Sequence, residues 1–149
     1  MPTSFELTPE MMRAIIMDHY SNPRNKHPMK GDGLLSAHSA SVNCIDDITV
    51  YLRFDGDKVA EASWDGVACA ISTASSDIVC DLLVGKTKEE ANYLLQQYTH
   101  MLHEEPYDPE PLEEALAFQN TFRQAARIHC ATIGWDAFAS LLKEHDHGH

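Results

Sequence analysis

The chain has 149 residues, which is enough to bury the core of one domain and too few for two of ordinary size. We therefore expect a single domain over residues 1–149. Asp and Glu outnumber Lys and Arg by 23 to 11, giving a net charge of −12. Because affinity for nucleic acid comes from Lys and Arg side chains that neutralise phosphates, this balance excludes a nucleic-acid partner from our expectations.

Charged residues interrupt the N-terminal segment, where Glu6, Glu10, Arg13 and Asp18 leave no continuous apolar stretch of the kind found in signal peptides. No apolar run in the sequence approaches the length of a membrane span. We therefore expect a cytoplasmic protein without membrane contact. In a reducing compartment, the four cysteines are expected to be thiols or metal ligands rather than a disulfide framework.

The first predicted helix begins at Thr8 and Pro9, which are typical of an N-cap and of the first helical position. Apolar residues at helical spacing follow. The segment from 21 to 33 is rich in Pro and Gly, so we expect it to end this helix in a long loop.

Residues 41 to 68 predict an antiparallel meander. Apolar and other side chains alternate from Ile48 to Phe54, which is strand periodicity. The turn sequence at 55 to 58 predicts a hairpin, whose return strand runs to Asp65 and Gly66. Combined with the helices on either side, this pattern predicts an α+β fold in which a small three-stranded antiparallel sheet packs against helices.

The rest of the chain is predicted to be helical. One helix spans 69 to 85, with Gly85 as its C-cap. Thr87 and Glu90 form a capping-box pattern for the next helix, from 88 to 102. The segment from 112 to 145 is expected to be largely helical, with a break near His129.

Candidate metal ligands lie at the predicted ends of these elements. Cys44 and Asp46 precede a strand, Cys69 lies where a strand leads into a helix, and Cys130 is expected just before the helix that contains Trp135. Two or three thiolates with one carboxylate suit zinc or an iron–sulfur cluster. The spacing matches no compact zinc motif, however, and buried cysteines that act as small apolar side chains are the competing interpretation.

Other candidates have simpler interpretations. Cys80 lies eleven residues after Cys69 in the same predicted helix, which places it about 16 Å away along the axis. We therefore expect Cys80 to be a structural thiol. Four further histidines have no evident partner in the sequence, and we expect them to face solvent or to cap helices: His19, His38, His100 and His103.

Three segments, in this order, resemble the U-type iron–sulfur cluster assembly proteins, the superfamily of IscU, SufU and the NifU N-terminal domain. They are DHYSNPRNKHPM (18 to 29), NCIDDITVYLRFDGDKVAEASWDGVACAISTASSD (43 to 77) and RIHCATIGWDAF (127 to 138). The segment between Cys69 and Cys130 is long, and no Leu-Pro-Pro-Val-Lys motif precedes Cys130. Both features make the chain most like the SufU branch. The resemblance implies the metal ligands Cys44, Asp46, Cys69 and Cys130.

The resemblance also implies a function. A SufU-type protein binds Zn²⁺ and accepts persulfide sulfur, here on Cys44, from a SufS-like cysteine desulfurase. It then serves downstream iron–sulfur assembly or acceptor proteins, as an accessory sulfurtransferase rather than a stand-alone catalyst. Arg127 matches a family arginine that steadies the ligands by its charge. The alternative is an IscU-type scaffold that assembles a [2Fe-2S] cluster, in which His129 is an additional ligand.

Two residues differ from the pattern of this branch. Ile45 stands where the family usually has glycine, and His129 stands where SufU-type proteins tend to have lysine. A β-branched residue at position 45 resists both positive φ and close approach of a partner. Ile45 therefore keeps open a third interpretation, in which the chain is a structural or regulatory binding protein.

Overall fold

The computed structural model describes residues 7–41 and 45–147. Three antiparallel strands form one sheet in the order β1-β2-β3, with β1 at Leu34–Ala40, β2 at Asp47–Asp55 and β3 at Lys58–Val67. The register pairs Ala40 with Asp47 and, beyond a two-residue turn, Asp55 with Lys58. The predicted three-stranded sheet and its hairpin are therefore confirmed.

The meander begins earlier than predicted, at Leu34 instead of residue 41. The sequence of β1 contains two serines, a histidine and two alanines, and no residue of this strand is fully buried. Its apolar alternation is consequently weak. In β2, by contrast, Ile48, Val50 and Leu52 are buried and alternate with less buried residues, as the sequence predicts.

The segment after the first helix is not only a loop. The backbone N–H of His27 donates to the carbonyl of Trp64 at 2.8 Å, and the N–H of Trp64 donates to the carbonyl of Asn25 at 3.0 Å. The Lys26 ammonium lies 5.4 Å from the centre of the Trp64 ring. This segment therefore covers the outer edge of β3, which would otherwise present unpaired backbone groups.

The helices are α1 at Pro9–Ser21, α2 at Ala70–Leu83, α3 at Lys88–Leu102 and α4 at Ala125–His147, with two 3₁₀ segments before α4: η1 at Glu110–Phe118 and η2 at Thr121–Arg123. Thr8 caps α1 by accepting from the backbone N–H of Met11. Thr87 and Glu90 form the predicted capping box of α3. None of the helices in the described part of the chain is long and apolar enough to cross a membrane.

The predicted helix break near His129 is wrong. The interruption lies earlier, at 119 to 124, where Gln124 has the non-helical dihedrals φ −125° and ψ 88°. His129 and Cys130 both lie inside α4, so Cys130 does not precede the helix of Trp135 but belongs to it. The turn-forming residues Asn120 and Thr121 were the better signal for the break.

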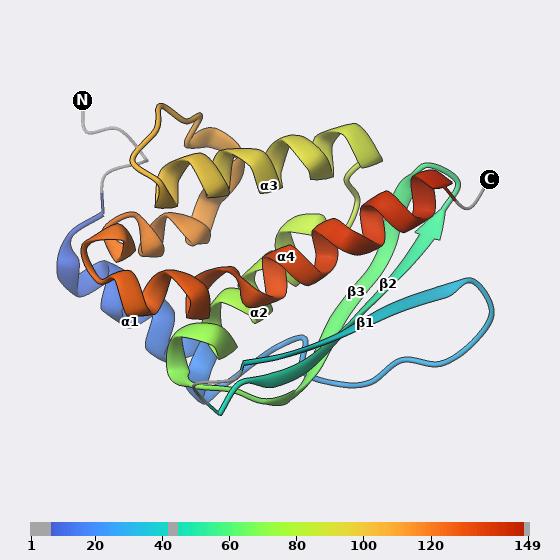
Figure 1. Ribbon diagram of the computed structural model, residues 1–149, viewed down its shortest axis with the longest axis horizontal. Helices are drawn as coiled ribbons and strands as arrows, with labels where there is room; N and C mark the ends of the chain where they lie inside the picture. The colour runs from blue at the N-terminus through green and yellow to red at the C-terminus, as the bar shows by residue number, and fades with distance from the viewer. Residues whose placement is uncertain (1–6, 42–44, 148–149) are drawn as a thin grey trace.

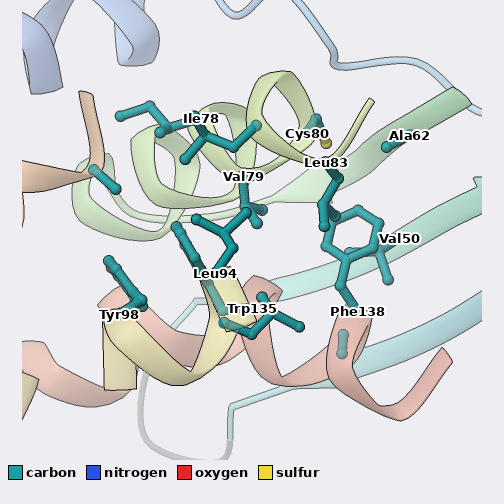
Figure 2. Close-up of a cluster of buried hydrophobic side chains, with 14 of the residues drawn as sticks. Val50, Ala62, Ile78, Val79, Cys80, Leu83, Leu94, Tyr98, Trp135 and Phe138 are labelled. Atoms are coloured by element: carbon teal, nitrogen blue, oxygen red, sulfur yellow. The ribbon is translucent and has the colours of Figure 1, made fainter. Parts of the chain in front are cut away.

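Helices α2 and α4 cover one face of the sheet, where α2 contacts β3 and α4 contacts β1 and β2 (Figure 1). Figure 2 shows Val79 and Leu83 on the side of α2 that faces Phe138 of α4 and Val50 of β2. All four side chains are inaccessible to solvent. This apolar cluster fixes α2 and α4 relative to the sheet.

Helices α2 and α4 approach each other closely at Gly134. A Cβ atom at this position would lie 2.4 Å from Ser76 Oγ and 3.0 Å from Ser76 Cβ, so only glycine permits this contact. Nearby, the hydroxyl of Ser75 donates to the carbonyl of Ala131 at 2.5 Å, and the indole N–H of Trp135 donates to the carbonyl of Ser75 at 3.2 Å. The start of α4 is thereby held against α2.

A buried ion pair joins α1 to α2. His19 Nδ1 lies 2.7 Å from Asp77 Oδ2, and His19 Nε2 lies 3.1 Å from Glu114 Oε1 in η1. His19 is fully buried, so its predicted solvent-facing role is wrong. No local pattern indicates this pairing, because the two carboxylates are 58 and 95 residues away along the chain.

Candidate metal centre

Asp46 is the first residue of the candidate centre. It directly precedes β2 and is only 1% exposed. Its carboxylate faces the N-terminus of α2, where Oδ1 accepts a 2.8 Å hydrogen bond from the backbone N–H of Cys69 and Oδ2 accepts a 2.5 Å hydrogen bond from the hydroxyl of Ser72. A helix N-terminus stabilises a negative charge placed there, so α2 both orients and stabilises this carboxylate.

The backbone near Asp46 is fixed on both sides. Its carbonyl accepts from the N–H of Ser41 at 2.8 Å, which joins the two ends of the loop between β1 and β2. Gly66 in β3 pairs with Ile48 and has φ +129°, and a Cβ there would lie 2.2 Å from the carbonyl oxygen of Asp47. Glycine at position 66 therefore allows β3 to pass close to the chain that carries Asp46.

Cys69 is the N-cap of α2, as predicted for a cysteine at the junction between a strand and a helix. Its Sγ lies 3.5 Å from the backbone nitrogen of Ser72 and 3.4 Å from the Ser72 hydroxyl oxygen. The sulfur therefore takes the position of the side-chain oxygen in an ordinary N-cap residue. Cys69 as a residue is half-buried.

Cys130 approaches from the other direction, on α4, and it is 5% exposed. One ligand atom from each of Asp46, Cys69 and Cys130 lies within 4.8 Å of the others. Around zinc, thiolate sulfurs at ~2.3 Å from the metal lie roughly 4 Å apart in a tetrahedron. The three groups therefore fit a metal ion after a small contraction, and sulfur and oxygen donors are ligands that zinc accepts.

The Cys130 thiol is difficult to ionise without a cation nearby. Burial raises its pKa to about 11, helped by hydrogen bonding to Cys69 and by the negative charges of Cys69 and Asp46. The hydroxyl of Ser72 acts in the opposite direction. A bound cation would reverse this repulsion, because metal binding favours the deprotonated form of its ligands.

The other predicted site residues have different outcomes. Cys44 lies outside the described residues, so its place relative to the three groups stays a prediction. Arg127 and His129 are both exposed on α4, and His129 is not among the groups whose ligand atoms converge with Cys130. Cys80 is fully buried in the core, and burial raises the pKa of its thiol well above the usual value. This agrees with its predicted structural role.

Sequence reasoning missed Ser72, whose hydroxyl touches two of the three groups. The signal was present, since Ser72 lies three residues after the N-cap Cys69, at a position whose side chain is directed back to the helix start. It also missed that two apolar residues close in sequence to the candidate ligands, Ile45 and Val67, are exposed at the surface. These side chains are 64% and 62% exposed and flank Asp46 and Cys69 along the chain.

The α+β fold gathers two thiols and a carboxylate between the N-terminus of α2, the second turn of α4 and the residue before β2. This arrangement defines a class of small proteins with a candidate mixed sulfur and oxygen metal centre. The model of the NifU-like N-terminal domain family matches residues 11–147. The chain belongs to this family.

Two relatives describe the range of the family. The zinc-dependent sulfurtransferase SufU of Bacillus subtilis (strain 168) is 32% identical over 139 residues, which are 93% of each chain. The iron–sulfur cluster assembly scaffold protein IscU of Streptococcus pyogenes serotype M1 is 33% identical over 132 residues, covering 87% of this chain and 81% of the relative.

Solved structures agree with this assignment. A crystal structure from Fervidobacterium islandicum AW-1, of a candidate iron–sulfur cluster assembly scaffold protein for the SUF system, superposes with a TM-score of 0.79 at 26% identity. It covers 86% of this chain and 93% of its own. A hypothetical protein of known crystal structure gives a TM-score of 0.80 at 30% identity, covering 91% and 99%. The predicted family and fold class are confirmed.

Proposed function

We propose that this chain acts in iron–sulfur cluster assembly as a zinc-binding sulfur acceptor, which takes sulfur from a SufS-like cysteine desulfurase and delivers it to downstream assembly or acceptor proteins. The observation that carries the proposal is the convergence of Asp46, Cys69 and Cys130 from three separate parts of the chain. The relative from Bacillus subtilis, named as a zinc-dependent sulfurtransferase, supports it. The absence of a disulfide at Cys69, Cys80 and Cys130 is consistent with a reducing, cytoplasmic setting.

In this proposal Cys44, Asp46, Cys69 and Cys130 hold the zinc ion, and Cys44 is also the acceptor. When bound, zinc would favour the deprotonated, nucleophilic form of these thiols. The Cys44 thiolate attacks the outer sulfur of the desulfurase persulfide. A sulfur–sulfur bond forms on Cys44 while the persulfide bond of the desulfurase breaks, and the desulfurase cysteine leaves as a thiolate. The transfer needs no external oxidant or reductant.

Asp46 has a specific task in this set. A carboxylate is a harder and less strongly donating ligand than a third or fourth thiolate. It leaves the formal charge of the centre the same as with four thiolates, but its weaker donation makes the exchange of one ligand easier. A sulfur acceptor needs such exchange, since the acceptor thiolate must become available to its partner. Arg127, exposed on the first turn of α4, is proposed to contribute positive charge at the surface near these ligands.

The proposal is tested by elemental analysis of protein purified without oxygen, followed by a desulfurase assay. We expect about one zinc ion per chain, as in mixed cysteine and carboxylate zinc sites, and faster release of sulfur by a SufS-like enzyme when the protein is added. Cys44→Ala should abolish the stimulation, whereas Cys80→Ala, which alters a core thiol, should retain it. Undiminished stimulation by Cys44→Ala would remove the acceptor role.

The second candidate function is an IscU-type scaffold for a [2Fe-2S] cluster, with His129 as an additional ligand. The 33% identity to the scaffold protein of Streptococcus pyogenes favours it. Reconstitution with iron and sulfide under anaerobic conditions distinguishes the two. A coloured protein that transfers its cluster to an apo-acceptor would support the scaffold, and a protein that stays colourless and retains zinc would support the sulfur acceptor.

A further inference from the structure

The hydroxyl of Ser72 contacts two of the three residues of the candidate metal site. Its oxygen donates to Asp46 Oδ2 at 2.5 Å and lies 3.4 Å from Cys69 Sγ. Ser72 is fully buried, although serine is usually found at protein surfaces. A buried hydroxyl is retained where it has a definite partner, because burying a polar group without one costs free energy.

The partners of Ser72 are held by rigid backbone. Ser72 is the third residue of α2, and its own backbone N–H points to Cys69 Sγ at 3.5 Å. The N–H of Cys69 meanwhile donates to the other oxygen of Asp46 at 2.8 Å. The first turn of α2 thus contacts both oxygens of Asp46, one through a backbone N–H and one through the Ser72 hydroxyl. These two hydrogen bonds set the plane of the carboxylate.

A carboxylate held in this way is oriented before any ligand arrives. Each carboxylate oxygen has two lone pairs, so an oxygen that accepts a hydrogen bond can still bind a cation. Hydrogen-bond partners of metal ligands orient the ligand and tune its basicity. Asp46 belongs to the loop before β2 rather than to α2, so its position depends on such partners more than that of Cys69, which is part of the helix.

From this geometry we propose that Ser72 is a positioning residue, which holds the carboxylate of Asp46 in place for Zn²⁺ and thereby raises the affinity of the centre for the metal. The inference rests on the proposed function to the extent that it takes Asp46 as a zinc ligand. The inference goes beyond the proposed function, because in it a residue that is not itself a ligand controls the affinity for zinc and the geometry of its binding.

Ser76 provides a matched control for the experiment. It lies one turn further along the same face of α2, is equally buried, and its hydroxyl has no hydrogen-bond partner within the part of the chain that the structure describes. Ser72→Ala and Ser76→Ala therefore remove the same atom from equally buried positions on one helix. Only the first removes a contact with a candidate ligand.

The measurement is the affinity for Zn²⁺, determined by competition with a chromophoric chelator. We expect Ser72→Ala to bind Zn²⁺ about 10- to 100-fold more weakly than the wild type, the range found when partners of metal ligands are removed. Ser76→Ala should match the wild type. Circular dichroism and urea unfolding of the metal-free proteins check that both variants are folded.

A double-mutant cycle tests whether Ser72 acts through Asp46. In an Asp46→Ala background the hydroxyl has no carboxylate to hold, so Ser72→Ala should cause no further loss of affinity. The absorption spectrum of the Co²⁺-loaded protein, which reports ligand geometry, should change in Ser72→Ala and not in Ser76→Ala. Equal effects of Ser72→Ala in both backgrounds would contradict the proposal, because the residue would then act independently of Asp46.

The outcomes separate this proposal from the proposed function. A wild-type protein that binds no Zn²⁺ would overturn both. Tight zinc binding by the wild type with the same affinity in Ser72→Ala would overturn the positioning role alone. Weaker zinc binding in Ser72→Ala, with wild-type affinity in Ser76→Ala, would support Ser72 as a positioning residue, and the acceptor role is tested separately by Cys44→Ala.

Discussion

The Nδ1 atom of His19 in α1 lies 2.7 Å from Oδ2 of Asp77 in α2, and neither side chain is accessible to solvent. Asp77 also accepts hydrogen bonds from the backbone N–H groups of Arg24 and Asn25 and from the indole of Trp64. One buried carboxylate thereby fixes α1, the segment that follows it, and β3 to the helix whose N-terminus carries Cys69.

Replacement of Asp77 should destabilise the whole fold. Asp77→Ala leaves His19 and three N–H donors without their acceptor in the interior, and removal of one member of a buried pair costs about 3–5 kcal/mol. The free energy of unfolding, measured with urea, checks this value. Asp81→Ala, one turn further along α2 at an exposed carboxylate, is the control and should cost less than about 1 kcal/mol. Comparable losses in both variants would contradict a special role for Asp77.

The same pair predicts a dependence of stability on pH. Burial lowers the pKa of His19, but the hydrogen bonds and negative charges of Asp77 and Glu114 outweigh it, so the pKa lies above the usual 6.5. Because the pKa of His19 is higher in the folded than in the unfolded protein, its protonation stabilises the fold. This contribution is complete below pH 6.5 and is lost as the pH rises through the raised pKa. For Asp77 the pKa is lowered, so its contribution is present above 3.8 and is lost in acid.

Urea unfolding in weakly acidic and weakly alkaline buffers tests the His19 contribution. The difference in free energy of unfolding between the wild type and His19→Gln should shrink as pH rises. His103→Gln, which alters an exposed histidine outside this pair, is the control variant. A His19→Gln difference that stays constant across this range would mean that folding does not raise the pKa of His19.

The close contact of α2 with α4 predicts an effect of a single methyl group. Gly134→Ala places a Cβ 2.4 Å from Ser76 Oγ, and such overpacking costs about 1–3 kcal/mol. Ser76→Gly removes the atoms that clash, so the double variant should regain part of the loss relative to Gly134→Ala. Thermal unfolding of the four proteins in the cycle provides the measurement, and strictly additive effects would argue against this contact.

The metal centre should contribute to stability. A ligand that binds only the folded state stabilises it by about 2.7 kcal/mol at a free concentration one hundred times its dissociation constant. Addition of a zinc chelator should therefore lower the melting temperature of the wild type and of Cys80→Ala, but not that of Cys69→Ala or Cys130→Ala. A chelator effect that survives in Cys69→Ala would place the metal elsewhere.

The exposed side chains of Ile45 and Val67 predict a contact surface for the desulfurase. Both flank the candidate ligands along the chain and are more than half exposed. Ile45→Asp and Val67→Asp should weaken the stimulation of a SufS-like desulfurase without changing the zinc content. Val84→Asp, at an exposed apolar residue at the opposite end of α2, is the control and should stimulate normally. A loss of zinc in the first two variants would show that they act on the metal centre instead.

Ile45 also differs from the family glycine, and the structure bears on this difference. Ile45 is 64% exposed, so the side chain that stands in place of the family glycine lies at the surface next to the buried Asp46. Its effect on access to Cys44 stays a prediction, since residue 44 lies outside the described part of the chain.

The sequence by itself determined the features that depend on neighbours along the chain. The N-caps at Thr8 and Thr87, the alternation along β2 and the hairpin at 55 to 58 follow from backbone chemistry within a few residues, and all were predicted correctly. The placement of Cys69 at the start of a helix was also predicted, whereas this helix ends at Leu83 with Val84 as its C-cap instead of the predicted Gly85.

Only the tertiary structure decided which distant residues meet. Asp46, Cys69 and Cys130 converge because α2 and α4 pack together at Gly134, a contact that no local pattern reveals. His19 is a second example. It was expected to face solvent, but carboxylates from α2 and η1, which are distant in the sequence, enclose it. Hydrogen bonds and ion pairs between elements depend on how the core packs, whereas caps and strands depend on the local sequence.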